Sequence, residues 1–276
     1  MADLVLRDGQ PEQILLVGDS RIRMFDGLIF TDRARGIEVL TRARWRAFFR
    51  STTFFGEDGR FDADMTRLWW ELRCAKHARD AGSPIFTPFR YRRFGASVDE
   101  VGVEPCGQDE HTIVVSGAGV DAWDIEEELA SYEIVLDEPV EGVDRLPGYL
   151  PVGTIDERAL RAIISARIAP LFNGMAALRD AGFSKLFMLG HAPPSTEDRP
   201  DWKPVRQRYV VRRLFDRVFA ERAREIGVAF VPVWDDLATG GLRDDRYFLD
   251  AEHVNHLGAT VLLSRVYAVQ EASLPI

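Results

Sequence analysis

The segment 14–20 reads Ile-Leu-Leu-Val-Gly-Asp-Ser and joins a buried-strand pattern to a turn. Its almost unbroken aliphatic run is typical of a strand in a parallel sheet, which is covered on both faces. Glycine tolerates the tight turn that must follow, and Ser20 then stands at the carboxyl end of the strand. Ligands bind in crevices at this end of the strands in open α/β sheets. The segment therefore predicts an α/β fold with a hydroxyl where a ligand would lie.

A second polar motif, near the other end of the sequence, contains groups that would activate Ser20. Asp250 and His253 lie three residues apart in a predicted loop. A serine hydroxyl is a poor nucleophile until a neighbouring base takes its proton. His253 can be that base at neutral pH, and Asp250 would fix its tautomer and stabilise the imidazolium. The three residues are a candidate nucleophilic triad; the alternative for Ser20 is a helix N-cap.

These two motifs resemble the first and last blocks of the SGNH/GDSL hydrolase family. The first block of the family is a strand ending in Gly-Asp-Ser. The last is Asp-x-x-His, often followed by Asn and a Gly-rich helix start, and here residues 250–259 read Asp-Ala-Glu-His-Val-Asn-His-Leu-Gly-Ala. The resemblance implies that Ser20 is the nucleophile, His253 the base and Asp250 its partner. It also implies a three-layer, flavodoxin-like α/β fold whose central, mostly parallel sheet has about five strands.

The oxyanion hole matches the family less well. The family supplies a Gly from its second block and an Asn from its third, beside the N–H of the serine itself. Gly117 and Gly119 follow a predicted strand and are the candidates for a backbone donor to the developing charge. The third-block Asn is not evident, because the chain contains only Asn173, within a predicted helix, and Asn255, within the last block.

Three other polar residues receive interpretations beside the triad. Asp19 is expected to anchor the turn through backbone hydrogen bonds rather than to be a second catalytic acid. His191, at the end of a predicted strand, is an accessory candidate for the oxyanion hole, and a turn residue satisfied by the backbone is the favoured interpretation. His256 lies one turn beyond His253; it is expected to start the last helix and is the fallback base.

Apolar periodicity predicts strands that alternate with helices along most of the chain. The predicted strands are 13–19, 112–116, 132–136, 185–190 and 228–233, and the predicted helices are 36–50, 64–81, 122–130, 154–181, 205–226 and 257–272. A capping box at Thr154 and Glu157 would open the fourth of these helices, and Pro170 would kink or interrupt it. This alternation predicts a single domain over residues 1–276. The segments 84–110 and 137–153 are predicted excursions near the site.

Composition bounds the partners and the location of the protein. A chain of 276 residues can bury one large core, and its net charge of −9 argues against a nucleic-acid partner drawn by bulk electrostatics. Basic clusters such as 206–213 are interpreted as solvated faces. Cys74 and Cys106 are too few and too far apart for a metal site and are expected to be reduced thiols. Without a signal-peptide pattern or a long apolar run, we expect a cytoplasmic protein with no membrane partner, no cofactor and no metal.

The resemblance implies an esterase that removes a small acyl group, acetyl above all, from a carbohydrate or a similar hydroxylated substrate. The same residues would serve an O-acyltransferase to a sugar hydroxyl. The missing Asn leaves open a catalytically weak, SGNH-like binding protein. Haloacid-dehalogenase-like phosphatases also carry Val-Gly-Asp-Ser, but they need an upstream Asp-x-Asp, and none precedes Gly18. No Gly-x-x-x-x-Gly-Lys-Ser/Thr phosphate loop occurs either.

Overall fold

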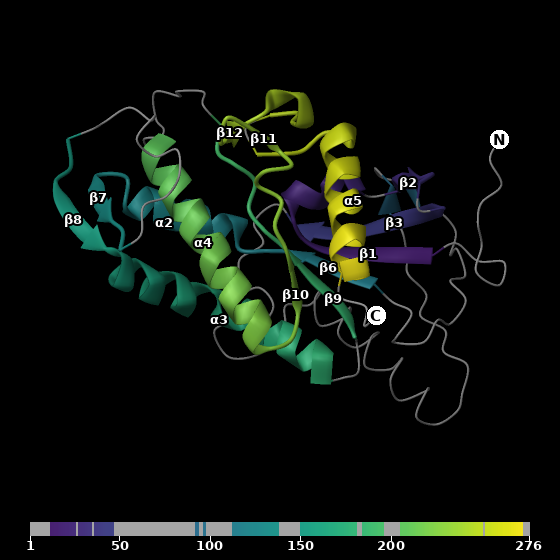
Figure 1. Ribbon diagram of the computed structural model, residues 1–276, viewed down its shortest axis with the longest axis horizontal. Coiled ribbons are helices and arrows are strands. Elements are labelled where there is room, and N and C mark those ends of the chain that lie inside the picture. The colour runs from purple at the N-terminus through teal and green to yellow at the C-terminus, as the bar shows by residue number, and fades with distance from the viewer. Residues whose placement is uncertain are drawn as a thin grey trace.

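Six strands form the central sheet, in the order β10-β9-β6-β1-β3-β2 (Figure 1). The computed structural model describes residues 12–25, 27–34, 36–46, 92–93, 96–97, 112–137, 150–180, 184–195, 205–250 and 252–272. The sheet strands are β1 (Glu12–Asp19), β2 (Ile29–Asp32), β3 (Ile37–Arg46), β6 (Thr112–Ser116), β9 (Lys185–Leu189) and β10 (Ala229–Val231). All neighbouring pairs are parallel except β2 with β3. The structure thus confirms the predicted α/β class and its mostly parallel sheet.

Alternate side chains of the central strands enter two separate cores. In β6, Ile113 and Val115 pack into the core on one face of the sheet, whereas Val114 packs into the core on the other. The same alternation occurs in β9, where Met188 and Phe187 point to opposite faces. Because both faces are buried, a nearly continuous apolar strand sequence is required. This requirement explains why these strands were recognisable from the sequence.

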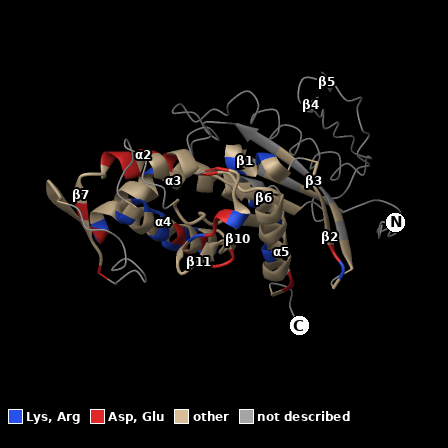
Figure 2. Ribbon diagram, turned by 90° about the horizontal axis from the view of Figure 1, so that it is seen from above, with Lys and Arg blue, Asp and Glu red and all other residues tan. Residues whose placement is uncertain are grey.

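Helices cover both faces and complete a three-layer arrangement (Figures 1 and 2). One face carries α2 (Gly119–Glu128), α3 (Glu157–Asp180) and α4 (Val205–Glu225), which pack on one another. The other carries the 3-10 helix η1 (Ser20–Phe25) and α5 (His256–Ala272). None of the helices within the described ranges combines the length and the apolar character needed to cross a membrane.

The helix predicted at 36–50 is wrong, because residues 37–46 form strand β3. This strand runs parallel to β1 over its whole length, from the pair Glu12–Val39 to the pair Asp19–Arg46. Every second residue contributes to the buried face: Val39 and Thr41 are fully buried, and Ile37 and Ala43 pack against the same core. β-branched residues at alternate positions suit a strand. Tertiary pairing with β1 decides the structure here.

Two elements on the side of α2 and α4 also depart from the predictions. The strand predicted at 132–136 exists as β7 (Tyr132–Val135), but it lies outside the central sheet and pairs with β8 (Gly153–Asp156). Since Thr154 belongs to β8, it does not cap α3. Asp156 takes that place, because its carboxylate accepts a hydrogen bond from the Ala159 N–H at 2.7 Å. Helix α3 also continues past Pro170, to Asp180.

Several smaller elements complete the description. They are β4 (Arg92–Arg93) with β5 (Ala96–Ser97), β11 (Ala238–Thr239) with β12 (Leu242–Arg243), and the short η4 (Asp245–Tyr247). The helix predicted at 64–81 lies outside the described residues. So do most of the predicted excursion at 84–110 and residues 138–149 of the excursion at 137–153.

Candidate active site

The parallel sheet brings the ends of β1, β6 and β9 to one edge. Ser20 directly follows β1, and Gly117 directly follows β6. Position 18 in β1 must be glycine, because a Cβ there would lie 1.8 Å from the carbonyl oxygen of Ser116 in the neighbouring strand. The Gly-Asp-Ser sequence therefore allows β1 and β6 to approach closely just before Ser20.

Ser20, His253 and Asp250 form a continuous hydrogen-bonded chain. The distance from His253 Nε2 to Ser20 Oγ is 2.9 Å, although 233 residues separate the two in sequence. His253 Nδ1 lies 2.8 Å from each carboxylate oxygen of Asp250. This order of nucleophile, base and orienting carboxylate is the arrangement that a serine nucleophile requires. The structure brings the three predicted residues together.

The turn 250–253 is shaped by the carboxylate of Asp250. One of its oxygens accepts hydrogen bonds from the backbone N–H groups of Glu252, at 3.0 Å, and His253, at 2.8 Å. Burial opposes ionisation of Asp250, but these two bonds and the contact with the His253 ring outweigh it and lower the pKa of Asp250. The carboxylate is thus ionised at neutral pH and can accept the Nδ1 proton of His253.

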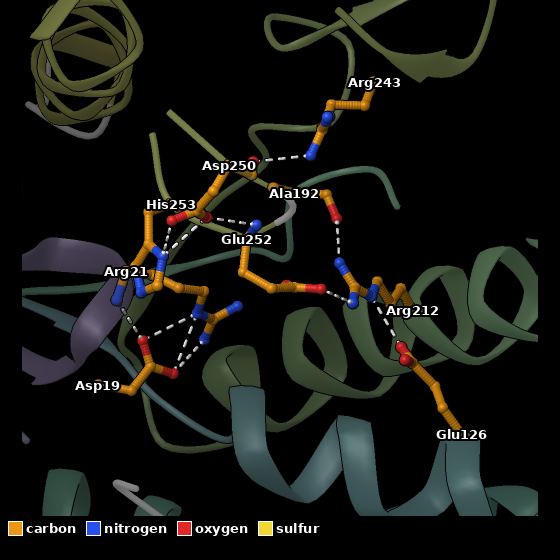
Figure 3. Close-up of polar contacts among 9 residues, drawn as sticks. All are labelled: Asp19, Arg21, Glu126, Ala192, Arg212, Arg243, Asp250, Glu252 and His253. Carbon is orange, nitrogen blue, oxygen red and sulfur yellow. Dashed lines mark hydrogen bonds and ion pairs between the residues drawn. The ribbon is translucent and has the colours of Figure 1, made fainter. Parts of the chain in front are cut away.

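Asp19 anchors the start of η1, as the sequence predicts, and it has an additional partner. Its carboxylate accepts the backbone N–H of Arg21 at 3.0 Å and forms an ion pair with the guanidinium of the same residue at 2.9 Å (Figure 3). Arg21 Nη2 also donates to the carbonyl oxygen of Gly117 at 3.1 Å. Arg21 therefore joins the turn after β1 to the turn after β6, a role that the sequence did not indicate.

The two glycine candidates for the oxyanion hole lie around this arginine. A Cβ at Gly119 would fall 2.5 Å from Asp19 Oδ2 and 2.8 Å from Arg21 Cζ, so the missing side chain makes room for the ion pair. The Asn255 side chain caps α5, accepting the Gly258 N–H at 3.0 Å and donating to the Arg246 carbonyl at 2.7 Å. Asn173 is exposed on α3. The oxyanion roles of the Ser20, Gly117 and Gly119 N–H groups stay predictions.

His191 is held by α4 and has no recorded hydrogen bond to the triad. Its Nδ1 lies 3.1 Å from Asp216 Oδ1, and its ring packs edge-on against Phe215 and Phe219. Its backbone N–H also donates to Asp216, at 2.7 Å. The favoured interpretation was that backbone groups satisfy His191. That partner is wrong, because His191 is hydrogen-bonded to the side chain of Asp216 on α4. The ring is 2% exposed and offers no surface to a ligand.

His256 is the first residue of α5 and is exposed, as expected of a helix-start residue. The ring hydrogen-bonded to Ser20 is that of His253. Among the described residues, no three His, Cys, Asp or Glu side chains are grouped as a metal site would need.

Part of the basic cluster 206–213 is buried, which contradicts its interpretation as a solvated face. Arg208 and Arg212 on α4 are 1% and 6% exposed. Arg212 contacts Glu252, the residue between Asp250 and His253, at 2.9 Å. Sequence reasoning missed both Arg212 and Glu252 as site residues, and the only available signal was the acidic residue inside the Asp-x-x-His block.

No protein-family model and no curated protein matches this sequence. Solved structures similar to the chain include an extracellular lipase from Streptomyces rimosus, with 13% identity, 95% of this chain and 99% of that one covered, and a TM-score of 0.44. A phospholipase A1 from Streptomyces albidoflavus is 10% identical, and the match covers 96% of this chain and 100% of the phospholipase, with a TM-score of 0.45. A variant of an acetyl-xylooligosaccharide esterase from Geobacillus is 12% identical, and the match covers 96% of this chain and 95% of the esterase, with a TM-score of 0.45. The chain's own strand order is that of an α/β fold with a mostly parallel sheet, in which the Gly-Asp-Ser turn follows β1 and the Asp-x-x-His block precedes α5.

Proposed function

We propose that this protein is a serine ester hydrolase that acts through Ser20, His253 and Asp250. The observation that carries the proposal is the pair of contacts at His253, 2.9 Å from Nε2 to Ser20 Oγ and 2.8 Å from Nδ1 to Asp250. A base at that distance from a hydroxyl is within reach of its proton. The Asp250 carboxylate holds the proton on Nδ1, and therefore leaves the Nε2 lone pair facing Ser20.

The proposed reaction has two halves. Ser20 Oγ attacks the acyl carbonyl carbon while His253 Nε2 takes the hydroxyl proton. When the tetrahedral intermediate collapses, the carbon–oxygen bond to the alcohol breaks, and His253 returns the proton to the leaving oxygen. A water then attacks the acyl-enzyme with the same proton movements and releases the acid. Asp250 stabilises the imidazolium formed in each half.

The substrate class rests on the family resemblance of the two sequence blocks. We propose a small acyl group, acetyl above all, on a carbohydrate or a similar hydroxylated alcohol. An acceptor sugar in place of water in the second half would make the protein an O-acyltransferase. The residues described are the same for both reactions, so only the fate of the acyl group separates them.

The test measures nitrophenol and acyl products from p-nitrophenyl acetate, with and without an acceptor sugar. A hydrolase releases free acetate at a rate that the sugar does not change. A transferase releases nitrophenol faster when the sugar is present and forms the acetylated sugar. p-Nitrophenyl butyrate and octanoate, run in parallel, should be turned over more slowly if the acyl pocket is small. Turnover of all three esters at the rate of buffer alone would contradict the enzymatic proposal and leave a binding role.

Exchange of Asp250 for Asn is expected to lower kcat for p-nitrophenyl acetate by about 10⁴-fold, as in a well-studied serine protease. Asn keeps an oxygen for the two turn N–H groups, so the turn should persist. Its amide N–H₂ can, however, donate to Nδ1, which favours the tautomer whose Nε2 already carries a proton and cannot accept another. Asp235→Asn, at a carboxylate that is 87% exposed, is the control. If kcat of Asp250→Asn stays within tenfold of wild type, Asp250 does not orient the base.

A further inference from the structure

The side chain of Glu252 points away from those of Asp250 and His253, although Glu252 lies between these two residues in the sequence (Figure 3). Asp250 and His253 turn toward each other, whereas the Glu252 side chain extends in the opposite direction, to Arg212 (Figure 3). Its side chain is 21% exposed, compared with 45% for that of Asp250. The turn that carries the base is therefore anchored to α4 through the residue immediately before His253.

Arg212 connects Glu252 to a buried carboxylate on another helix. Its Nε donates to Glu126 Oε1 of α2 at 2.7 Å, and its Nη2 donates to Glu252 Oε1 at 2.9 Å. The side chains of Arg212 and Glu126 are 7% and 2% exposed. The planar guanidinium fork fixes the direction of both bonds. α2, α4 and the turn 250–253 are thereby linked by one cation (Figure 3).

Glu252 is the second carboxylate on Arg212, and keeping its charge there carries a desolvation cost. Glu126 alone would balance Arg212, and the charge of Glu252 also interacts with those of Arg21 and Arg208. Burial opposes ionisation of Glu252, but the guanidinium of Arg212, with smaller contributions from Arg21 and Arg208, outweighs it and lowers the pKa of Glu252. Burying a further charge brings little net stability, since desolvation offsets the attraction. The main effect of the bond between Glu252 and Arg212 is therefore structural, since it holds the turn 250–253 against α4.

We propose that Glu252 and Arg212 are positioning residues, which hold the turn 250–253 on α4 so that His253 Nε2 stays within hydrogen-bonding distance of Ser20 Oγ. The inference rests on the proposed function, because it assigns the ion pair to alignment of that base. A displacement of about 1 Å at a reacting group costs on the order of 10²-fold in rate. Release of the turn from α4 should therefore lower the kcat of the enzyme, while its KM for a small ester stays unchanged.

Glu252→Ala is the decisive variant, because it leaves the Arg212–Glu126 pair intact and neutral. We expect kcat for p-nitrophenyl acetate to fall by about 10- to 100-fold, with KM unchanged within twofold and a melting temperature close to that of wild type. Glu252→Gln, which retains an oxygen for Arg212, should recover part of the loss. If Glu252→Ala keeps the kcat of wild type, the inference is wrong.

The chain contains a matched control. Arg161 on α3 also bridges two glutamates, Glu157 at 2.7 Å and Glu221 at 3.0 Å, and none of the three is in the turn or the triad. Glu221→Ala removes one carboxylate from this second trio, just as Glu252→Ala does from the first. It should leave kcat unchanged. Equal kcat losses in the two alanine variants would show a general effect of charge and overturn the positioning role.

Hydrogen–deuterium exchange separates failure of this inference from failure of the proposed function. Exchange in the segment 246–258 should be faster in Glu252→Ala than in wild type, and unchanged in Glu221→Ala, whether or not the protein hydrolyses an ester. Unchanged exchange in Glu252→Ala would overturn the inference. A wild type that is no more active than its Ser20→Ala variant would instead overturn the proposed function, and the exchange result would still show whether Glu252 holds the turn.

Discussion

Ser20→Ala is expected to lower kcat for p-nitrophenyl acetate by at least about 10⁴-fold, because loss of a triad nucleophile removes nearly all of the covalent pathway. The hydroxyl oxygen lies 2.9 Å from His253 Nε2 and is the side-chain group of Ser20 that the proposed reaction uses. The fold should be unaffected, since the structure records no other side-chain hydrogen bond of Ser20 among the described residues. Steady-state kinetics with a thermal melt checks both expectations.

A covalent readout makes this prediction sharper. Wild type quenched in acid during turnover should carry an acetyl group on the peptide that contains Ser20, and the Ser20→Ala variant should carry none. An acetyl group found on another residue, with kcat unaffected by Ser20→Ala, would show that the nucleophile lies elsewhere. A folded Ser20→Ala variant as active as wild type would exclude the serine mechanism altogether.

The central sheet could be predicted where burial leaves a signal in the sequence. β6 and β9 are covered on both faces, so their residues are apolar in succession, and these two strands and β1 match the predicted ranges closely. β3 was predicted wrongly as a helix because Ile37 and Leu40 also fit a helical spacing, although the arginines at positions 42, 44 and 46 alternate as the side chains of a strand do. Its true partner, β1, lies more than twenty residues earlier, and pairing at that distance leaves no local pattern.

The triad could be predicted because each of its residues lies in a short motif with a mechanism attached. The trio of Glu126, Arg212 and Glu252 could not, because its members come from α2, α4 and the last turn, and no spacing connects them. In the sequence, Arg212 is one of several arginines on an amphipathic helix. Only the packing of α2 against α4 shows that this one is buried.

Exchange of His253 for Ala is expected to abolish turnover, with a loss on the order of 10⁵- to 10⁶-fold in kcat, comparable to removal of the nucleophile itself. Without the imidazole, no group takes the Ser20 proton as the acyl carbon is attacked, and none returns it to the leaving alcohol. The His253 side chain is 20% exposed and lies outside the buried apolar cores, so the melting temperature should change little.

His256→Ala is the matched control for this variant, since it removes the same ring from the same segment. His256 is exposed at the start of α5, and the ring hydrogen-bonded to both Ser20 and Asp250 is that of His253. We therefore expect kcat of His256→Ala to stay within about threefold of wild type, as for a surface substitution that touches no reacting group. If both alanine variants are folded and lose activity equally, His253 is not the specific base. If only His256→Ala is inactive, the turn must rearrange during catalysis to present the second ring, and the contact of 2.9 Å between His253 and Ser20 would then belong to a resting state.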